Sequence, residues 1–185
     1  MNAVAKEAGC RARPKLTFDV ATVWKEVTPA LELELLEFWE RNHAIGDADR
    51  ARQRAAQAVC IARGADGMLC AVSTAVVRVL PLIGEPLYYF RLFFAKSVRG
   101  QGQVVPMFNR ARAVLQAYNA GLPRPESIGM LVELESRHLS AEHRRAYVDE
   151  GESFFVGYSL RGLQLRVSYF KDAMLTRMPR SGQGA

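Results

Sequence analysis

The chain has 185 residues, of which 49% are hydrophobic and 24% are charged, and its formal net charge is +6. This length and balance fit one globular domain and exclude two full-sized ones. No apolar run reaches the roughly 20 residues of a membrane span, and three cysteines without metal-ligand spacing favour a reducing compartment over secretion. We therefore expect a soluble, cytoplasmic protein without a metal site.

The positive charge narrows the choice of partner without deciding it. A basic protein can bind nucleic acid, an acidic lipid surface or an anionic cofactor. The arginines are spread through the chain, and the sequence holds neither a helix-turn-helix signature nor an aromatic RNA-binding motif. Nucleic acid is therefore the less favoured partner.

The first half of the chain predicts two helices followed by three strands. Residues 1–15 read as a flexible segment, residues 16–173 as one domain and residues 174–185 as a flexible tail. Thr28 and Pro29 start a helix over 29–43, and Asp47 can cap a second helix that ends near residue 57. Apolar, β-branched runs then predict strands over 59–63, 68–80 and 87–94, the first two joined by a tight turn.

The second half alternates helices and strands. Apolar spacing predicts a helix over 103–118, then a strand over 128–135 and a short helix over 141–150. Residues 154–159 and 163–170 form a hairpin around Arg161-Gly162. The whole order predicts an α/β fold, with a central mixed sheet of about six strands flanked by four helices.

The junction between the strand over 87–94 and the helix after it has the chemistry of a pyrophosphate site. A helix N-terminus offers free backbone N–H groups and a partial positive charge. Gly100 and Gly102 let the main chain approach a phosphate closely, and Arg99 adds a fixed charge. The alternative is a tight turn that binds no ligand. The sequence holds neither a P-loop nor a G-x-G-x-x-G dinucleotide motif at this junction.

Residues 99–104, RGQGQV, resemble the acyl-CoA-binding signature of the GNAT superfamily, [Q/R]-x-x-G-x-[G/A]. In that family the signature follows the fourth strand and opens the third helix. Lys96 stands where the family commonly has proline, and Val104 replaces the final small residue. The resemblance covers about residues 28–170 and implies a GNAT-like fold. It implies that acyl-CoA contacts the following residues: Phe93, Phe94, Ala95, Lys96, Arg99, Gly100, Gln101, Gly102, Gln103 and Val104.

Three residues are candidates for proton transfer. The segment from Tyr147 to Gly151 resembles the family's Y-x-x-x-G, whose tyrosine often protonates the departing CoA thiolate, and its alternative is a packing tyrosine. Glu133 and Glu135 share one face of a strand, so either can act as a base or hold a cationic substrate. Their alternative is two solvated carboxylates. Arg91, charged within an apolar strand, either pairs with one of these glutamates or contacts an acidic substrate group.

The resemblance implies an acyl-CoA-dependent N-acyltransferase, acetyl-CoA being the first choice of donor. The acceptor is an amine of a small molecule or protein. One alternative is an N-acyl amino acid or acyl-homoserine-lactone type of synthase that takes a long acyl chain from a carrier protein. Another is a non-catalytic regulator that binds acyl-CoA. A homodimer, in which two chains pair through the last predicted strands, is also possible.

Overall fold

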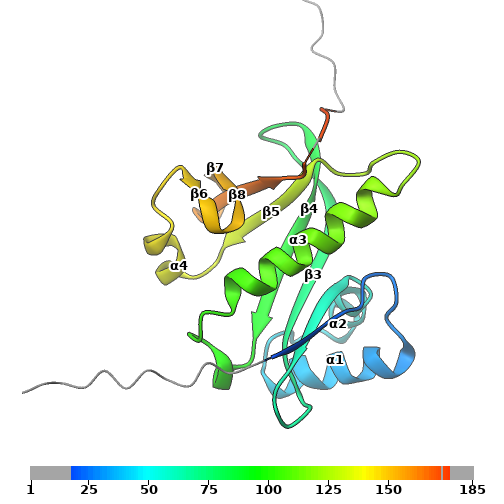
Figure 1. The fold of residues 1–185 in the computed structure, drawn as a ribbon. Helices are drawn as coiled ribbons and strands as arrows, with labels where there is room; N and C mark the ends of the chain where they lie inside the picture. The colour runs from blue at the N-terminus through cyan, green and yellow to red at the C-terminus, as the bar shows by residue number, and fades with distance from the viewer. Residues whose placement is uncertain (1–17, 172, 176–185) are drawn as a thin grey trace, which may run out of the picture.

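The computed structural model describes residues 18–171 and 173–175 (Figure 1). The flexible ends expected at 1–15 and over most of 174–185 lie outside the described residues. Helices α1 (Pro29–Arg41) and α2 (Ala48–Ala55) begin where the sequence predicts. Thr28 Oγ1 accepts from the Leu31 N–H at 3.2 Å, and Asp47 Oδ1 accepts from the Arg50 N–H at 2.6 Å. Each cap satisfies an N–H group that has no partner within its own helix.

The strands form one mixed sheet in the order β1-β2-β3-β4-β5-β8-β7-β6. All neighbours are antiparallel except β4 and β5, which are parallel. The sheet has eight strands where about six were predicted, because β1 and β6 are too short to show a period of two. The strands are β1 (Asp19–Thr22), β2 (Ala58–Arg63), β3 (Leu69–Leu80), β4 (Glu85–Phe94), β5 (Gly129–Leu134), β6 (Tyr147–Val148), β7 (Ser153–Tyr158) and β8 (Gln164–Tyr169).

Helices cover the two faces of the sheet separately. Helix α3 (Val104–Ala120) lies in front of the strands in Figure 1 and buries Met107, Ala111 and Leu115 against Tyr88 and Met130. Helices α1 and α2 pack on the opposite face, in a core that contains Phe38, Trp39, Ala55, Ile61 and Val72. Strand β4 therefore lies between two cores, which explains its dense apolar sequence.

The prediction of a helix over 141–150 is wrong. Helix α4 (Arg137–Glu142) begins earlier, after its N-cap Ser136, and Tyr147 lies on strand β6, followed by a 3₁₀ turn, η2 (Asp149–Gly151). The Ala146 carbonyl accepts from the Phe155 N–H at 2.7 Å and from Arg166 Nη2 at 3.2 Å. Contacts with distant strands thus override the local helical propensity of this segment.

Among the described residues, no helix combines the length and the apolar character needed to cross a membrane. The predicted hairpin around Arg161-Gly162 is confirmed as the turn between β7 and β8, closed by the Ser159 N–H donating to the Leu163 carbonyl at 2.8 Å. This turn projects toward the end of β5, which places residues from the end of the chain near those of its middle.

Candidate active site

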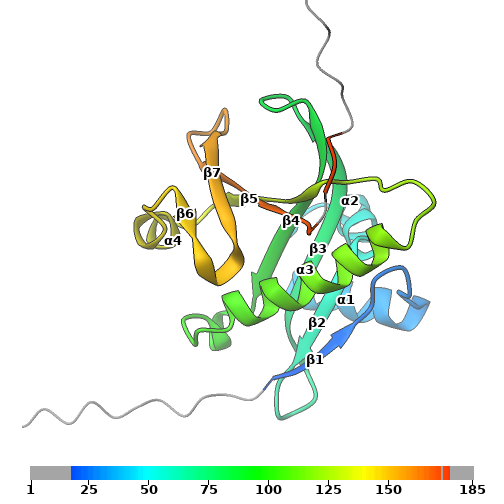
Figure 2. The same cartoon turned by 45° about the horizontal axis from the view of Figure 1, so that its top comes forward.

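The parallel strands β4 and β5 pair over only a short length and then separate. Their register joins Tyr88 to Met130, Tyr89 to Leu131 and Phe90 to Val132. Strand β4 continues beyond this point to Phe94, and β5 continues to Leu134. In Figure 2 the two strands run at an angle to each other, β5 toward α4 and β4 toward the loop that joins it to α3. Beyond Phe90 and Val132 the two adjacent strands are no longer paired with each other, and we call this unpaired region the opening.

One backbone amide of β4 is directed at this opening. The Ala95 N–H donates to the Cys70 carbonyl on β3 at 2.8 Å. Because backbone groups alternate sides along a strand, the N–H and carbonyl of Phe94 face away from β3, toward the opening. The Phe94 carbonyl accepts from Arg99 Nε at 2.9 Å. Within the predicted stretch from Phe93 to Ala95, the Phe94 N–H is therefore the group placed to meet a ligand.

The glycine loop that follows β4 has the conformation its sequence demands. A 3₁₀ turn, η1 (Lys96–Val98), buries Val98 and leaves Lys96 exposed. Gly100 and Gly102 have φ angles of +75° and +71°. Residues with a Cβ rarely adopt this left-handed region. The two glycines reverse the chain and bring Gln103 to the start of α3, so all the predicted cofactor-binding residues lie in one continuous segment.

The N-terminus of α3 is free to bind an anion. Its N-cap, Gln103, makes no side-chain capping bond, and the first helical hydrogen bond runs from the Met107 N–H to the Gln103 carbonyl at 3.1 Å. Pro106 has no N–H, so the amides of Val104 and Val105 are the donors without an intrahelical partner. Together with the helix dipole, these donors favour a phosphate at this end.

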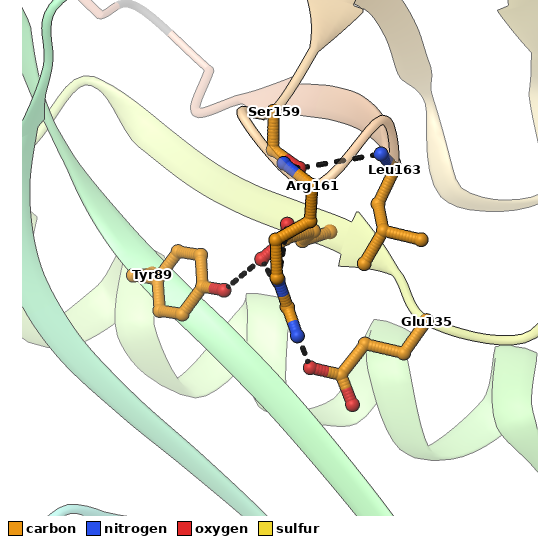
Figure 3. Close-up of polar contacts among 6 residues, drawn as sticks. Tyr89, Glu135, Ser159, Arg161 and Leu163 are labelled. Carbon is orange, nitrogen blue, oxygen red and sulfur yellow. Dashed lines mark hydrogen bonds and ion pairs between the residues drawn. The ribbon is translucent and has the colours of Figure 1, made fainter.

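A second polar group, the glutamate–arginine cluster (Tyr89, Glu133, Glu135 and Arg161), lies at the end of β5. Arg161 Nη2 contacts Glu133 Oε2 at 2.8 Å and Glu135 Oε1 at 3.0 Å. The Tyr89 hydroxyl donates to the same Glu133 oxygen. Figure 3 shows Tyr89, Arg161 and Glu135 converging from β4, the β7–β8 turn and the end of β5.

Glu133 is held firmly in its ionised form. Burial opposes its ionisation, but hydrogen bonds from Arg161, Ser159 and Tyr89 outweigh burial and lower its pKa to about 2. Its side chain is 9% exposed, whereas that of Glu135 is 65% exposed. A carboxylate with so low a pKa has little affinity for a proton. Of the two predicted bases, Glu135 is the more accessible to solvent.

The ion pair anticipated between Arg91 and a glutamate is made by Arg161 instead. Arg91 stacks over the ring of Tyr89, with its guanidinium carbon 4.3 Å from the ring centroid. Sequence reasoning missed Arg161 and Tyr89 as site residues. Arg161 read only as part of a turn, and Tyr89 only as one aromatic residue in an apolar strand.

Tyr147 stands apart from the glutamates. Its ring stacks on Phe154 at 4.8 Å between centroids, and 40% of the residue is exposed. Strands β8 and β7 lie between β5 and β6, which at ~4.8 Å per strand places the Tyr147 backbone roughly 14 Å from β5. The structure therefore does not bring Tyr147 beside Glu133 and Glu135, and its acid role stays a prediction.

A buried arginine holds the segment that carries Tyr147. Arg166 is 2% exposed. Its guanidinium donates to the carbonyls of His143 and Arg145 at 3.3 and 3.1 Å and to that of Ser153 at 3.0 Å. Backbone carbonyls thus satisfy a buried cation and tie the loop before β6 onto β8.

The cysteines and histidines form no reactive group within the described part of the chain. Cys60 and Cys70 are free and buried, and burial raises the pKa of both thiols. They pack as small apolar residues. Over residues 18–171 and 173–175, no three His, Cys, Asp or Glu side chains are grouped to hold a metal ion.

No protein-family model and no curated protein matches the sequence. Solved structures do match. A GNAT-family acetyltransferase from Streptococcus pneumoniae superposes with a TM-score of 0.52 at 10% identity, over 84% of this chain and 100% of that chain. A structure assigned to a phosphinothricin N-acetyltransferase gives a TM-score of 0.50 at 11% identity, over 84% and 100%. At such identities the likeness establishes a shared fold.

Proposed function

The chain has the GNAT acetyltransferase fold, and from this premise we propose that it is an acyl-CoA-dependent N-acyltransferase, with acetyl-CoA as the first choice of donor. One observation carries the proposal. The free N-terminus of α3 follows a loop with two left-handed glycines, directly beside the opening between β4 and β5. In the proposed complex, the pyrophosphate binds the amides at the start of α3, and the pantetheine arm enters the opening.

The proposed reaction is transfer of the acyl group from sulfur to nitrogen. The uncharged amine attacks the thioester carbonyl carbon, a C–N bond forms, and the C–S bond breaks. The amine loses one proton and the departing thiolate gains one. The Phe94 N–H, which faces the opening, is the proposed donor to the carbonyl oxygen as negative charge develops there.

The exposure and hydrogen bonds of the predicted residues suggest which of them acts as the base and which only orients its neighbours. Glu135, exposed at the rim of the glutamate–arginine cluster, is the proposed base, acting directly or through water. Glu133, whose low pKa opposes protonation, is proposed to orient Tyr89 and Arg161. Tyr147 remains the proposed acid for the thiolate.

A second candidate function is a regulator that binds acyl-CoA without transferring it. Arg91 occupies β4 where many GNAT enzymes carry an acidic residue, and Arg161 already engages both nearby glutamates. A synthase that takes long acyl chains from a carrier protein is the other alternative. Both cysteines of the described residues are free, which supports a cytoplasmic location. A single domain over residues 16–173 and a homodimer also remain proposals.

The test is acyl-CoA binding followed by formation of an acylated amine. Purified protein is first titrated with CoA, acetyl-CoA and a medium-chain acyl-CoA by calorimetry. It is then incubated with the preferred donor and mixed amines, and the products are identified by mass spectrometry. Saturable binding with formation of an acylated amine supports the enzyme. Binding without transfer supports the regulator, and the absence of any binding contradicts both.

A further inference from the structure

Positive side chains gather on the face of the sheet that α1 and α2 cover. Arg78 and Arg91 contact the ring of Tyr89, with their guanidinium carbons 5.3 and 4.3 Å from its centroid. Arg54, from α2, lies close enough to Arg91 for the two charges to repel each other. Arg161 contacts Glu133, which also binds the Tyr89 hydroxyl, so four arginines from β3, β4, α2 and the β7–β8 turn lie around Tyr89 and Glu133.

The carboxylates nearby do not balance this charge. Glu133 and Glu135 are the acidic side chains of the group, and Arg161 engages both of them. Glu135 also acts on Arg54 and Arg91, but only through longer-range attraction. Four arginines against two glutamates leave a net charge of +2. None of the ion pairs formed among the described residues includes Arg54, Arg78 or Arg91.

Two of these arginines are half-buried, which makes the missing counter-charge costly. Burial, followed by repulsion from Arg91, lowers the pKa of Arg54. Burial also lowers the pKa of Arg91, and Arg78 adds to that effect. Guanidinium groups nevertheless keep their charge in proteins. A partly desolvated pair of like charges is stabilised by an anion, and the planar fork of arginine matches carboxylate and phosphate.

The pair also lies within reach of the proposed reaction centre. Arg91 directly follows Phe90, the last β4 residue that pairs with β5. Phe94 is three residues further on, or ~10 Å along the strand. The Arg91 guanidinium lies over the Tyr89 ring, so the acceptor itself spans the remaining distance. A small molecule whose anionic group meets Arg91 can therefore place an amine at the opening where the Phe94 N–H points.

We propose that the acceptor carries a carboxylate or phosphate group as well as its amine, and that Arg54 and Arg91 bind this anionic group. The inference rests on the proposed acyltransferase function and specifies its substrate class. It gives Arg91, an unexplained charge in an apolar strand, the role of a specificity-determining residue.

The experiment compares acceptors that differ only in the anion. The pairs are alanine with alaninamide and phosphoethanolamine with ethanolamine, each assayed with saturating donor. The amine of alaninamide is less basic than that of alanine, so a preference for alanine cannot come from amine ionisation. We expect kcat/KM to favour the anionic member by about tenfold or more in at least one pair, and that pair distinguishes carboxylate from phosphate. Equal use of both members, or preference for the neutral one, would overturn the proposal while leaving the transferase standing.

Variants assign the preference to the arginines. Arg54→Gln and Arg91→Gln are expected to reduce the preference at least fivefold, mainly through KM for the acceptor, with KM for the donor unchanged. Arg52→Gln is the matched control, because Arg52 lies on the same helix, is 59% exposed and pairs with Asp49. A preference that persists in both Arg54→Gln and Arg91→Gln would contradict the assignment.

A second measurement does not need turnover. The CoA-saturated protein is treated with the arginine reagent phenylglyoxal, and modification of each peptide is followed by mass spectrometry. Phosphoethanolamine or alanine should slow modification of Arg54 and Arg91, whereas ethanolamine and alaninamide should not, and Arg52 should react equally in all samples. If no acyl transfer is detected, this result decides: selective protection supports the anion site, and equal reactivity in all samples rejects it.

Discussion

The glycine loop and the glutamate–arginine cluster are built in opposite ways. The loop and the start of α3 come from one run of the chain, residues 96–104. The cluster joins Tyr89 to Glu133 across 44 positions and Arg161 to Glu133 across 28. A local motif therefore reveals the first region, while the second exists only after the sheet has formed. The proposed cofactor site was visible in the sequence for this reason. Of the second region, the sequence indicated Glu133, Glu135 and Arg91 but missed the following partners: Tyr89, Arg161 and Arg54.

The largest effect is expected at Arg166, which holds the 143–153 segment by contacts between distant residues, while none of its hydrogen bonds to described residues reaches the glycine loop. Arg166→Met keeps much of the aliphatic stem but leaves three carbonyls of the 143–153 segment, that of Ser153 buried, without their donor. We expect a loss of about 3 kcal/mol in the free energy of unfolding, measured by urea denaturation.

The exposed neighbour Arg144 provides the matched control, since Arg144→Met should change stability little. The Arg166→Met protein, while folded, should still bind CoA at the glycine loop. Equal stability of the two variants, or loss of CoA affinity in step with activity, would break the separation between the two regions.

Arg99→Glu tests the local region. The substitution replaces a positive charge that lies beside the loop and that contacts the Phe94 carbonyl. We expect the dissociation constant for CoA to rise by about tenfold to a hundredfold, which is roughly 1.4 to 2.7 kcal/mol. Arg124→Glu, beyond the other end of α3, makes the same change in net charge and should leave affinity nearly unchanged. Equal affinities in the two variants would remove Arg99 from the site.

Tyr147→Phe tests whether Tyr147, which lies on β6, three strands away from β5, acts as the acid in the proposed reaction. If the phenol protonates the thiolate, kcat should fall about tenfold or more while acetyl-CoA affinity stays the same. The ring still stacks on Phe154, so stability should hold. Unchanged kcat would return Tyr147 to a packing role and leave the acid to be sought nearer the opening.

The smallest effect concerns pH and the Glu133 carboxylate. Its folded pKa of about 2 lies below the ordinary value, so ionised Glu133 stabilises the fold above pH ~4.3. That contribution is lost as the pH falls from there toward 2. Glu133→Gln and Arg161→Gln should each flatten the dependence of unfolding free energy on pH in this window. A dependence as steep as in the parent protein would show that another group controls it.

Features that depend on neighbouring residues could be predicted from the sequence, and features that depend on distant residues could not. The caps at Thr28 and Asp47, the central strands and the turn that contains Gly100 and Gly102 were predictable because each depends on neighbouring residues. The mixed α/β fold followed from their order. The helix over 141–150 failed because Arg166 and Phe155, far along the chain, take the carbonyls a helix would use. The ion pairs of Arg161 could not be predicted, since register between distant strands decides them.

The central claim, that the free end of α3 binds the pyrophosphate of CoA, is tested most directly by calorimetric titration with CoA and with pantetheine. Pantetheine keeps the arm that would enter the opening but lacks the pyrophosphate. We predict saturable CoA binding, pantetheine binding that is weaker by about a hundredfold, and a much smaller gap in Arg99→Glu. Equal affinity for the two ligands, or no binding of CoA by the folded protein, would contradict the account.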